Sequence, residues 1–149
     1  MGQVIHPAAV SYQDIDLSWM IGRVVASVSY HDPKLWYFGF EPNVNIGVEC
    51  LWRVVEPDRV VLTSEDHNQK FGLPAPVDAA AKCTELLAVR RIAAVVLRVA
   101  AADLVIEFSG DLRLEVISNS IGYDNWRVRD PSGTEYFAQG GGQISKWKS

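Results

Sequence analysis

Apolar and polar residues alternate with a period of two in two stretches of this chain, and the two stretches align with each other without a gap. Residues 23–50 match residues 91–118 at an offset of 68 positions. Alternation of this kind is typical of β-strands that bury one face. Because it recurs in the same register, the sequence predicts an internal duplication of a strand-turn-strand unit. The alternating apolar positions are Trp36, Phe38, Phe40, Val44, Ile46 and Val48 in the first copy, and Leu104, Ile106, Phe108, Leu112, Leu114 and Val116 in the second.

A second motif recurs beyond an insertion. Residues 52–57 (WRVVEP) resemble residues 126–131 (WRVRDP) at an offset of 74, and a further β-like run follows each motif. Alternating strands also resemble one another by chance, but the ungapped register and the recurring motif favour duplication. The sequence therefore predicts repeats over 23–64 and 91–139, each of them a meander of four to five antiparallel strands.

The parity of the apolar residues constrains the turn of each hairpin. Directly opposed residues share a face, so Phe40 should pair with Val44. A connection of two residues would instead place Phe40 opposite Asn45. We therefore expect a three-residue connection in both copies, with Asn43 and Asp111 as the residues suited to a left-handed conformation.

One helix is expected between the two copies, over about residues 76–88. Pro76 fits a first helical turn, and Asp78 suits the positive end of the helix dipole. Together these features predict an α+β fold in a single domain, residues 1–149. It would consist of two tandem antiparallel β-meander repeats, arranged as a sandwich or a barrel-like sheet and joined by one helix. The apolar stripe of the helix would be Ala80, Cys83 and Leu87.

The cysteines and the hydropathy of the chain point to the cytoplasm. Cys50 and Cys83 have no zinc-ligand spacing, so we expect two buried thiols in a reducing compartment, with a disulfide between them as the alternative. Residues 1–19 contain neither the basic nor the apolar region of a signal peptide. No run approaches the roughly 18 apolar residues of a spanning helix, so we expect no membrane association.

The net negative charge is concentrated in the first half of the chain, because that half holds fewer basic residues. The sequence carries 14 basic and 18 acidic residues, and residues 1–74 hold 5 of the basic and 9 of the acidic ones. Such an excess forms either a solvated face or a docking surface that attracts a basic partner. An acidic chain without a basic run does not suit nucleic acid, so we expect no nucleic-acid partner.

The sequence contains no recognisable catalytic, metal-binding or phosphate-binding motif. His6, His31 and His67 form no metal-ligand pattern, and a hydrolase or isomerase would need His31 or His67 in a cleft beside a carboxylate. Gly140–Gly142 precede a strand-like run rather than a helix, which predicts a glycine-rich turn and not a phosphate loop. We therefore predict no catalytic residue, no metal site and no cofactor.

Two tryptophans begin equivalent strands. Trp52 and Trp126 are expected to pack between the two copies, and an aromatic patch for a ligand or partner is the alternative. In that alternative Tyr123, Trp126 and Tyr136 would line the mouth of a cavity between the repeats.

The last third of the chain, about residues 86–147, contains a series of motifs: residues 108–116 (FSGDLRLEV), residues 122–128 (GYDNWRV), a Pro-Ser-Gly turn at 131–133, and Gly140–Gly142 followed by Trp147. This series resembles a family of small uncharacterised bacterial proteins with the pattern F-x-x-G-x-x-L-x-V, Y-[ED]-x-W, G-G and W. Asp124 stands where that pattern often has Glu. The resemblance implies no catalytic residue. Small bacterial domains of this kind look like immunity proteins of toxin systems, which work by binding alone.

The sequence therefore favours a non-enzymatic interaction protein, immunity-like in the sense of this resemblance, that acts through protein–protein contact. The alternative is a small-molecule binding module with a cavity between the two repeats. Unpaired sheet edges would also allow a homodimer. The candidate residues for binding a partner or a ligand are Tyr123, Asp124, Trp126, Tyr136, Glu56 and Asp58.

Overall fold

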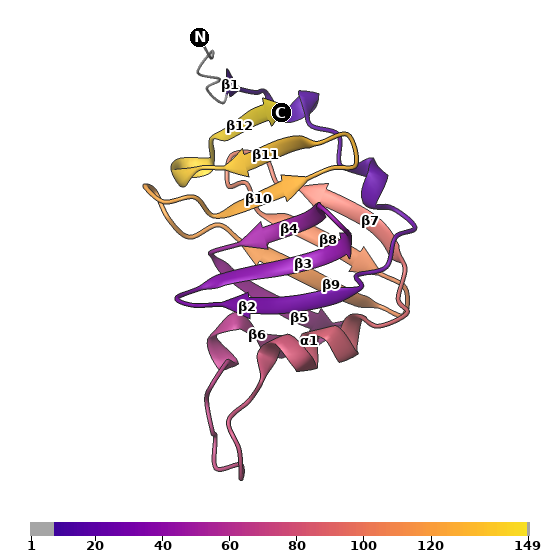
Figure 1. The fold of residues 1–149 in the computed structure, drawn as a ribbon, viewed down its shortest axis with the longest axis vertical. Helices are drawn as coiled ribbons and strands as arrows, with labels where there is room; N and C mark the ends of the chain where they lie inside the picture. Colours follow the sequence, from indigo (N-terminus) through magenta and orange to yellow (C-terminus); the bar gives the residue numbers. More distant parts are fainter. Residues whose placement is uncertain (1–7, 149) are drawn as a thin grey trace.

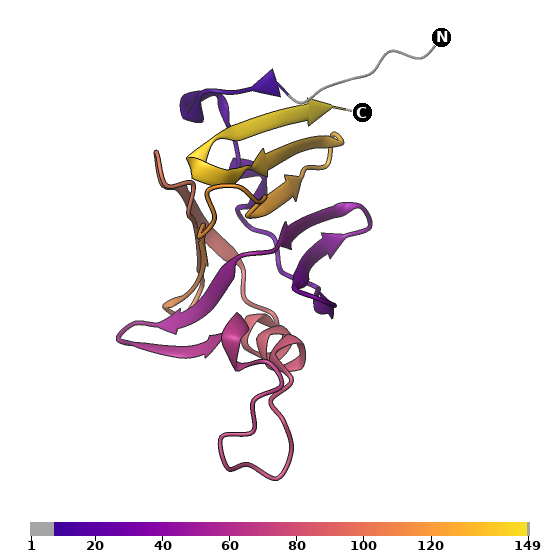
Figure 2. The ribbon, with the colours of Figure 1, turned by 90° about the vertical axis from the view of Figure 1, so that its left-hand side faces the viewer.

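The computed structural model describes residues 8–148, and it places twelve strands of this range in two antiparallel sheets (Figure 1). The sheets face each other as a sandwich, with one helix between them at one side (Figure 2). The seven-stranded sheet has the order β1 (Ala8–Ala9), β12 (Ile144–Lys148), β11 (Thr134–Ala138), β10 (Trp126–Arg129), β4 (Val44–Val48), β3 (Leu35–Glu41) and β2 (Ser27–His31). The five-stranded sheet has the order β6 (Arg59–Thr63), β5 (Leu51–Glu56), β9 (Leu112–Ile117), β8 (Leu104–Phe108) and β7 (Ile92–Leu97).

Two meanders with the same strand order form the centre of the fold. β2, β3 and β4 are consecutive neighbours in the seven-stranded sheet, and β7, β8 and β9 are consecutive neighbours in the five-stranded sheet. The predicted α+β fold of two antiparallel meanders joined by a helix is confirmed. Each meander ends after three strands, because the chain then crosses to the opposite sheet: β5 pairs with β9, and β10 pairs with β4. The crossing lets each sheet cover the apolar face of the other.

The strand pairings of the two sheets correspond at the two offsets found in the sequence. Ile46 of β4 lies opposite Val128 of β10, and Leu114 of β9 lies opposite Val54 of β5. Ile46 and Leu114 differ by 68 positions, and Val54 and Val128 differ by 74. The two units therefore occupy equivalent places in the sandwich. Their origin by duplication stays a prediction, whereas their matched pairing is a property of the structure.

Aromatic side chains from both sheets meet in the core. The ring of Trp52 on β5 lies edge-on to the rings of Trp36 and Phe38 on β3, with centroid separations of 5.0 and 5.6 Å. Trp126 donates its indole N–H to the carbonyl oxygen of Ala102 at 2.7 Å. Trp52 and Trp126 are buried, with exposed fractions of 0% and 1%. The contacts above join each ring to residues of its own unit, so packing between the two units stays a prediction. The inter-sheet space around these rings is therefore filled by side chains.

The hairpin registers agree with the parity argument except at one turn. Pairs such as Trp36 with Val48 form as expected, and in the second unit Phe108 pairs with Leu112 across the three-residue connection 109–111. In the first unit the register shifts between Gly39 and Glu41, and Glu41 pairs with Val44. The expected pairing of Phe40 with Val44 is therefore wrong.

A β-bulge at Phe40 explains this difference. The turn contains only Pro42 and Asn43, and Asn43 adopts a left-handed φ of 62°. With a two-residue turn alone, either Phe40 or Val44 would point to solvent. The extra residue of the bulge shifts the register by one, so that both side chains face the core. Phe40 and Val44 accordingly remain 9% and 5% exposed.

The helix α1 (Ala79–Leu87) begins three residues later than predicted. Asp78 is its N-cap and accepts a hydrogen bond from the Ala81 N–H at 3.1 Å. Pro76 precedes the cap, in a segment where the Val77 N–H bonds to the Gln69 carbonyl. The helix packs against the edge strand β2, where Thr84 Oγ1 accepts the Val28 N–H at 3.2 Å. It therefore covers an open sheet edge and closes one side of the sandwich (Figure 2).

The glycine cluster near the C-terminus is a close-packed turn, as predicted. It forms the 3₁₀ turn η4 (Gly140–Gly142), next to the loops that hold Ala100 and Ile121. A Cβ on Gly142 would lie 1.9 Å from the Ala100 carbonyl oxygen, and one on Gly140 would lie 2.2 Å from the Ile121 carbonyl carbon. Glycine is therefore required here because three backbone segments approach one another. Within residues 8–148, no helix is long and apolar enough to cross a membrane.

Candidate functional site

Four connecting segments converge at one end of the sandwich. They are the β2–β3 turn, the β4–β5 crossing, the 3₁₀ turn η3 (Ser64–Asp66) with the residues after it, and the β9–β10 connection. All four lie at the left of Figure 1 and face the viewer in Figure 2. A pocket of about 430 Å³ lies among them, which we call the end pocket. Its lining includes Tyr30, Lys34, Trp36, Glu49, Glu65 and His67.

His67 has a structural role in the end pocket. Its Nδ1 accepts a hydrogen bond from the backbone N–H of Ala79, the first residue of α1, at 3.1 Å. Its ring lies 4.6 Å from that of Tyr30 and 5.2 Å from that of Trp36. Because Nδ1 already accepts this hydrogen bond, the imidazole stabilises the start of the helix, and Nδ1 is not free to accept a proton from a ligand.

His31 does not belong to this pocket. His31 is exposed at the end of β2, with its ring edge-on to Tyr37 at 5.3 Å, and it does not line the end pocket. His6 lies outside the described residues. Only one histidine of residues 8–148 is therefore placed in this pocket.

The two cysteines are free and buried. Cys50 lines the end pocket but is only 6% exposed, and Cys83 lies fully buried on α1. Burial raises the pKa of each thiol to about 12. The thiols are therefore protonated at neutral pH, which leaves them without the thiolate that nucleophilic chemistry requires. Of the two alternatives that the sequence allowed, separate buried thiols are the observed one.

Three carboxylates without an ion pair among residues 8–148 lie at this end of the sandwich: Glu49 and Glu65 line the end pocket, and Asp124 lines a second hollow together with Glu49. Glu49, Glu65 and Asp124 are exposed, and none has an ion-pair partner among residues 8–148. The ring of Tyr123, which is 75% exposed, has the Lys34 ammonium 5.5 Å from its centroid. We call these five residues the end surface: a negative surface that carries one exposed aromatic ring and one lysine.

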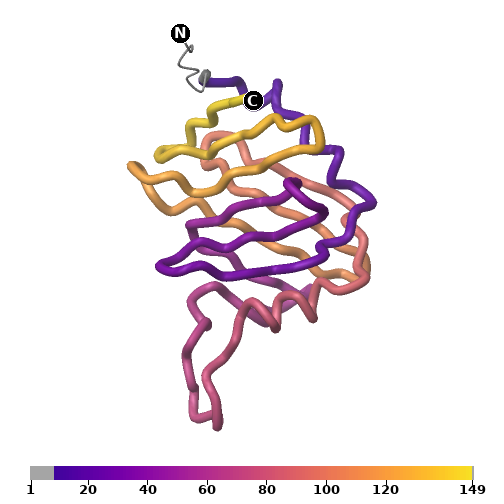
Figure 3. Tube along the Cα trace, in the orientation of Figure 1, coloured from indigo at the N-terminus to yellow at the C-terminus, as the bar shows by residue number. Residues whose placement is uncertain are grey.

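A projecting loop leaves the sandwich beside the end pocket (Figures 1 and 3). It spans residues 68–77, and at its root the Asn68 N–H bonds to the Val77 carbonyl and the Val77 N–H to the Gln69 carbonyl, both at 2.8 Å. Phe71 and Leu73 in this loop are 67% and 49% exposed. Phe71 has a left-handed φ of 47°, a conformation that costs an aromatic residue about 1–2 kcal/mol. The closed root therefore holds an exposed apolar tip in a defined shape.

Sequence reasoning did not identify this loop. The relevant signal is local: Lys70-Phe71-Gly72-Leu73-Pro74 interrupts both the period of two and the helical period, yet contains two large apolar residues. An apolar residue in a segment with no buried face is a candidate for an interface.

The six residues predicted from the sequence to bind a partner or a ligand lie in three different regions of the structure: the end surface, the core and the β5–β6 turn. Tyr123 and Asp124 belong to the end surface. Trp126 and Tyr136 point into the core and are 1% and 5% exposed, and burial raises the pKa of Tyr136. Both rings therefore contribute to packing in the core, and Trp126 is also among the residues that line a hollow of about 200 Å³ beside Asp124.

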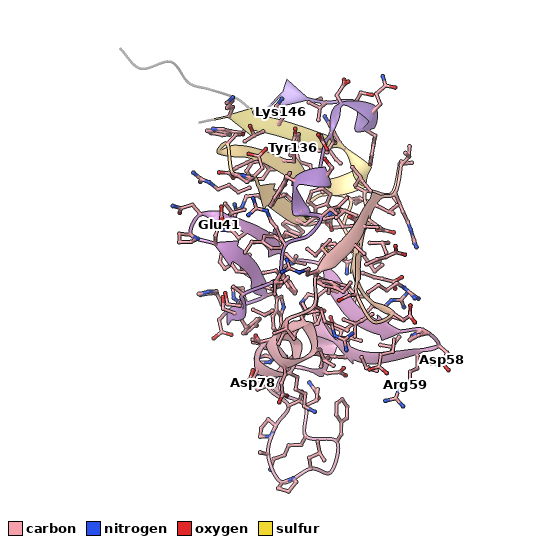
Figure 4. The ribbon with its side chains drawn as sticks, turned by 90° about the vertical axis from the view of Figure 1, so that its right-hand side faces the viewer. Glu41, Asp58, Arg59, Asp78, Tyr136 and Lys146 are labelled. Carbon is pink, nitrogen blue, oxygen red and sulfur yellow. The ribbon has the colours of Figure 1, made fainter. Side chains whose placement is uncertain are left out.

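Glu56 and Asp58 form the third place, the turn between β5 and β6. Figure 4 shows Asp58 and Arg59 at the tip of this hairpin, far from Tyr136. Glu56 lies five positions along β5 from Leu51, which lines the end pocket, and this spacing corresponds to about 17 Å. The acidic residues of the first half thus lie on more than one surface.

Comparison of the chain with family models, with curated proteins and with solved structures gave no match. The resemblance described above therefore stays a prediction.

Proposed function

We propose that this protein is a non-enzymatic binding protein that docks a basic protein partner on its end surface and anchors it with the projecting loop. The observation that carries the proposal is that a loop with two exposed apolar side chains, Phe71 and Leu73, leaves the fold beside a surface with three carboxylates that form no ion pair among residues 8–148. The loop begins at the end pocket, because Asn68 and Gln69 line this pocket and also form the backbone hydrogen bonds at the root of the loop.

Charge complementarity indicates what kind of partner would fit. Exposed carboxylates without intramolecular partners attract a positive surface, which raises the association rate more than the affinity. The affinity would come from the tip, because burial of one Phe side chain contributes about 2 kcal/mol. A partner with basic residues around an apolar socket satisfies both features.

The polar groups of the end pocket also favour binding over catalysis. His67 is held by the Ala79 N–H, the Cys50 thiol is protonated, and Ser64 Oγ accepts the Trp52 backbone N–H at 3.2 Å. Side chains that are engaged in structural contacts are poorly suited to move protons. An immunity-type function in the cytoplasm, as the resemblance implies, would need only such a docking surface.

A homodimer stays a prediction. The edge strand β2 is covered by α1, whereas β7 has no strand on its outer side among residues 8–148 beyond a single bridge between Val24 and Arg91. β1 and β6 are edge strands as well, so two copies would pair through one of the edges β1, β6 or β7.

The docking proposal can be tested by calorimetry with the purified product of a neighbouring gene. We expect the double variant Glu49→Lys/Glu65→Lys to weaken binding by about tenfold or more, and Phe71→Ser to weaken it by a similar factor. The matched control is Glu56→Lys/Asp58→Lys, which reverses the same number of charges on the β5–β6 turn. Equal losses in both double variants, or no complex at all, would contradict the proposal.

A further inference from the structure

The outer faces of the two sheets differ at one pair of equivalent positions. On the five-stranded sheet, the Glu115 carboxylate lies between two guanidinium groups: Arg53 Nε is 2.6 Å from Oε1, and Arg113 Nε is 3.1 Å from Oε2. Glu115 is 4% exposed, so its side chain is almost entirely covered on this face of the sheet.

The equivalent position on the seven-stranded sheet has no side chain. Arg127 lies opposite Gly47, as Arg53 lies opposite Glu115. Glu115 and Gly47 differ by the same 68 positions that relate the two meanders. Both sheets therefore carry an arginine at this position, Arg53 and Arg127. The carboxylate that Arg53 binds, that of Glu115, has no equivalent on β4, where Gly47 takes its place.

A hollow of about 200 Å³ is found at this position. Arg127 borders it on one side, and Tyr37, Phe137 and Leu35 supply apolar walls. Glu49 and Asp124, neither of which forms an ion pair among the described residues, also line it. The hollow thus combines one cation, two carboxylates and three aromatic residues, Tyr37, Trp126 and Phe137.

The guanidinium of Arg127 keeps one edge turned toward Gly47. Its Nη2 donates to Asn45 Oδ1 at 3.0 Å, and its Nη1 lies 3.5 Å from Glu135 Oε2. A Cβ built on Gly47 would lie 3.3 Å from Nη2 and 3.6 Å from Nε. Nε has no hydrogen-bond partner among residues 8–148, so this N–H is available to an acceptor in the hollow.

We propose that this hollow binds a small zwitterionic amino carboxylate. Its carboxylate would accept hydrogen bonds from the Nε edge of Arg127, in the role that the Glu115 side chain has toward Arg53. Its ammonium group would lie between Glu49 and Asp124, and its methylene chain between Tyr37 and Phe137. Arginine binds carboxylates in this edge-on manner, and aromatic faces favour a neighbouring cation.

The dimensions select the length of the ligand. The hollow has a volume of about 200 Å³ and is partly open to solvent, so it suits a small molecule rather than a folded partner. Glu49 follows Gly47 by two residues, a rise of about 7 Å along the strand. An amino acid whose ammonium is separated from the carboxylate by three or four methylene groups matches this spacing better than an α-amino acid.

The test is an NMR titration of the full chain with 4-aminobutyrate and 5-aminovalerate, with butyrate and butylamine as singly charged controls. We expect saturable shifts at Gly47 and at the Arg127 Nε–H with a Kd of about 1 mM or tighter, and at least tenfold weaker binding of both controls. The absence of saturable shifts would overturn the proposal. Equal binding of butyrate would overturn the assignment to a zwitterion.

Two variants locate the site. Gly47→Glu supplies the missing carboxylate from the chain itself, so the fold should be retained and binding lost. Should that variant fail to fold, Glu49→Gln/Asp124→Asn changes only exposed side chains and should weaken binding of 4-aminobutyrate by about tenfold while butyrate is unaffected. Wild-type affinity in folded Gly47→Glu, or in the double variant, would refute the site. Glu49 and Asp124 also belong to the end surface, so the double variant should weaken docking of a protein partner as well. Gly47→Glu leaves the end surface and the projecting loop unchanged, so loss of ligand binding with docking retained in that variant separates the two proposals.

Discussion

Replacement of Glu115 by Gln should show how much the ion-pair cluster on the five-stranded sheet contributes to stability. Burial by itself raises the pKa of this carboxyl, but its hydrogen bonds and charge interactions with Arg53 and Arg113 outweigh the burial, and the net pKa is lowered from 4.5. The native state therefore favours the ionised form. Gln keeps the shape of the side chain but loses the charge.

The expected loss is about 1–2 kcal/mol. Removal of one partner from a fully buried ion pair costs about 3–5 kcal/mol, because the remaining charge cannot regain water. Here the Arg53 and Arg113 side chains are 43% and 37% exposed, so both can be rehydrated and the cost is smaller. With a urea dependence of about 2 kcal/mol per molar, the midpoint of unfolding should fall by about 0.5–1 M.

The pH dependence gives a second, independent readout. Because the folded pKa is lowered, the stabilisation by Glu115 is fully present above the unfolded pKa of about 4.5 and is lost as the pH falls through the lower folded value. Wild type and Glu115→Gln should therefore differ at pH 7 and converge at low pH. Glu107→Gln is the control, since Glu107 is exposed on β8 and forms no ion pair among the described residues. Equal midpoints for the two variants at pH 7, or a difference that persists in acid, would refute the reasoning.

Three further predictions concern the helix, the glycine turn and the thiols. Asp78→Ala removes the cap of α1 and should lower the free energy of unfolding by about 1 kcal/mol in a urea titration; an unchanged midpoint would contradict a role for the cap. Gly142→Ala would place a methyl group 1.9 Å from the Ala100 carbonyl oxygen, at a residue whose φ is 85°. The melting temperature should therefore fall by at least about 4 °C, and a smaller change would contradict close packing of this turn. Because burial raises the pKa of Cys50 from 9.0 to about 12, a thiol reagent at pH 8 should label the unfolded chain and not the native one, and stability should fall above pH 9; rapid native labelling would contradict this.

The candidate site could be predicted only in part from the sequence. Tyr123 and Asp124 were singled out and lie on the end surface, but Trp126, two residues beyond Asp124, lies in the core. The alternation of Trp126 with Val128 contains that information, because residues two apart on a strand share a face and Val128 is fully buried. Glu56 and Asp58 were grouped with the other acidic residues by charge alone, and charge does not indicate where in space a residue lies.

By itself the sequence determined the strands, their buried faces and nearly all of the hairpin register, since these depend on side chains only a few residues apart. It also determined that one helix separates two similar units. Only the tertiary structure decided that β5 and β10 exchange sheets, and that a bulge at Phe40 corrects a turn shortened by one residue. It also decided that Gly47 leaves a hollow where Glu115 fills one. The physical reason is that a period of two shows which side of a strand is apolar, whereas the sheet that covers that side is chosen by contacts between residues far apart in the chain.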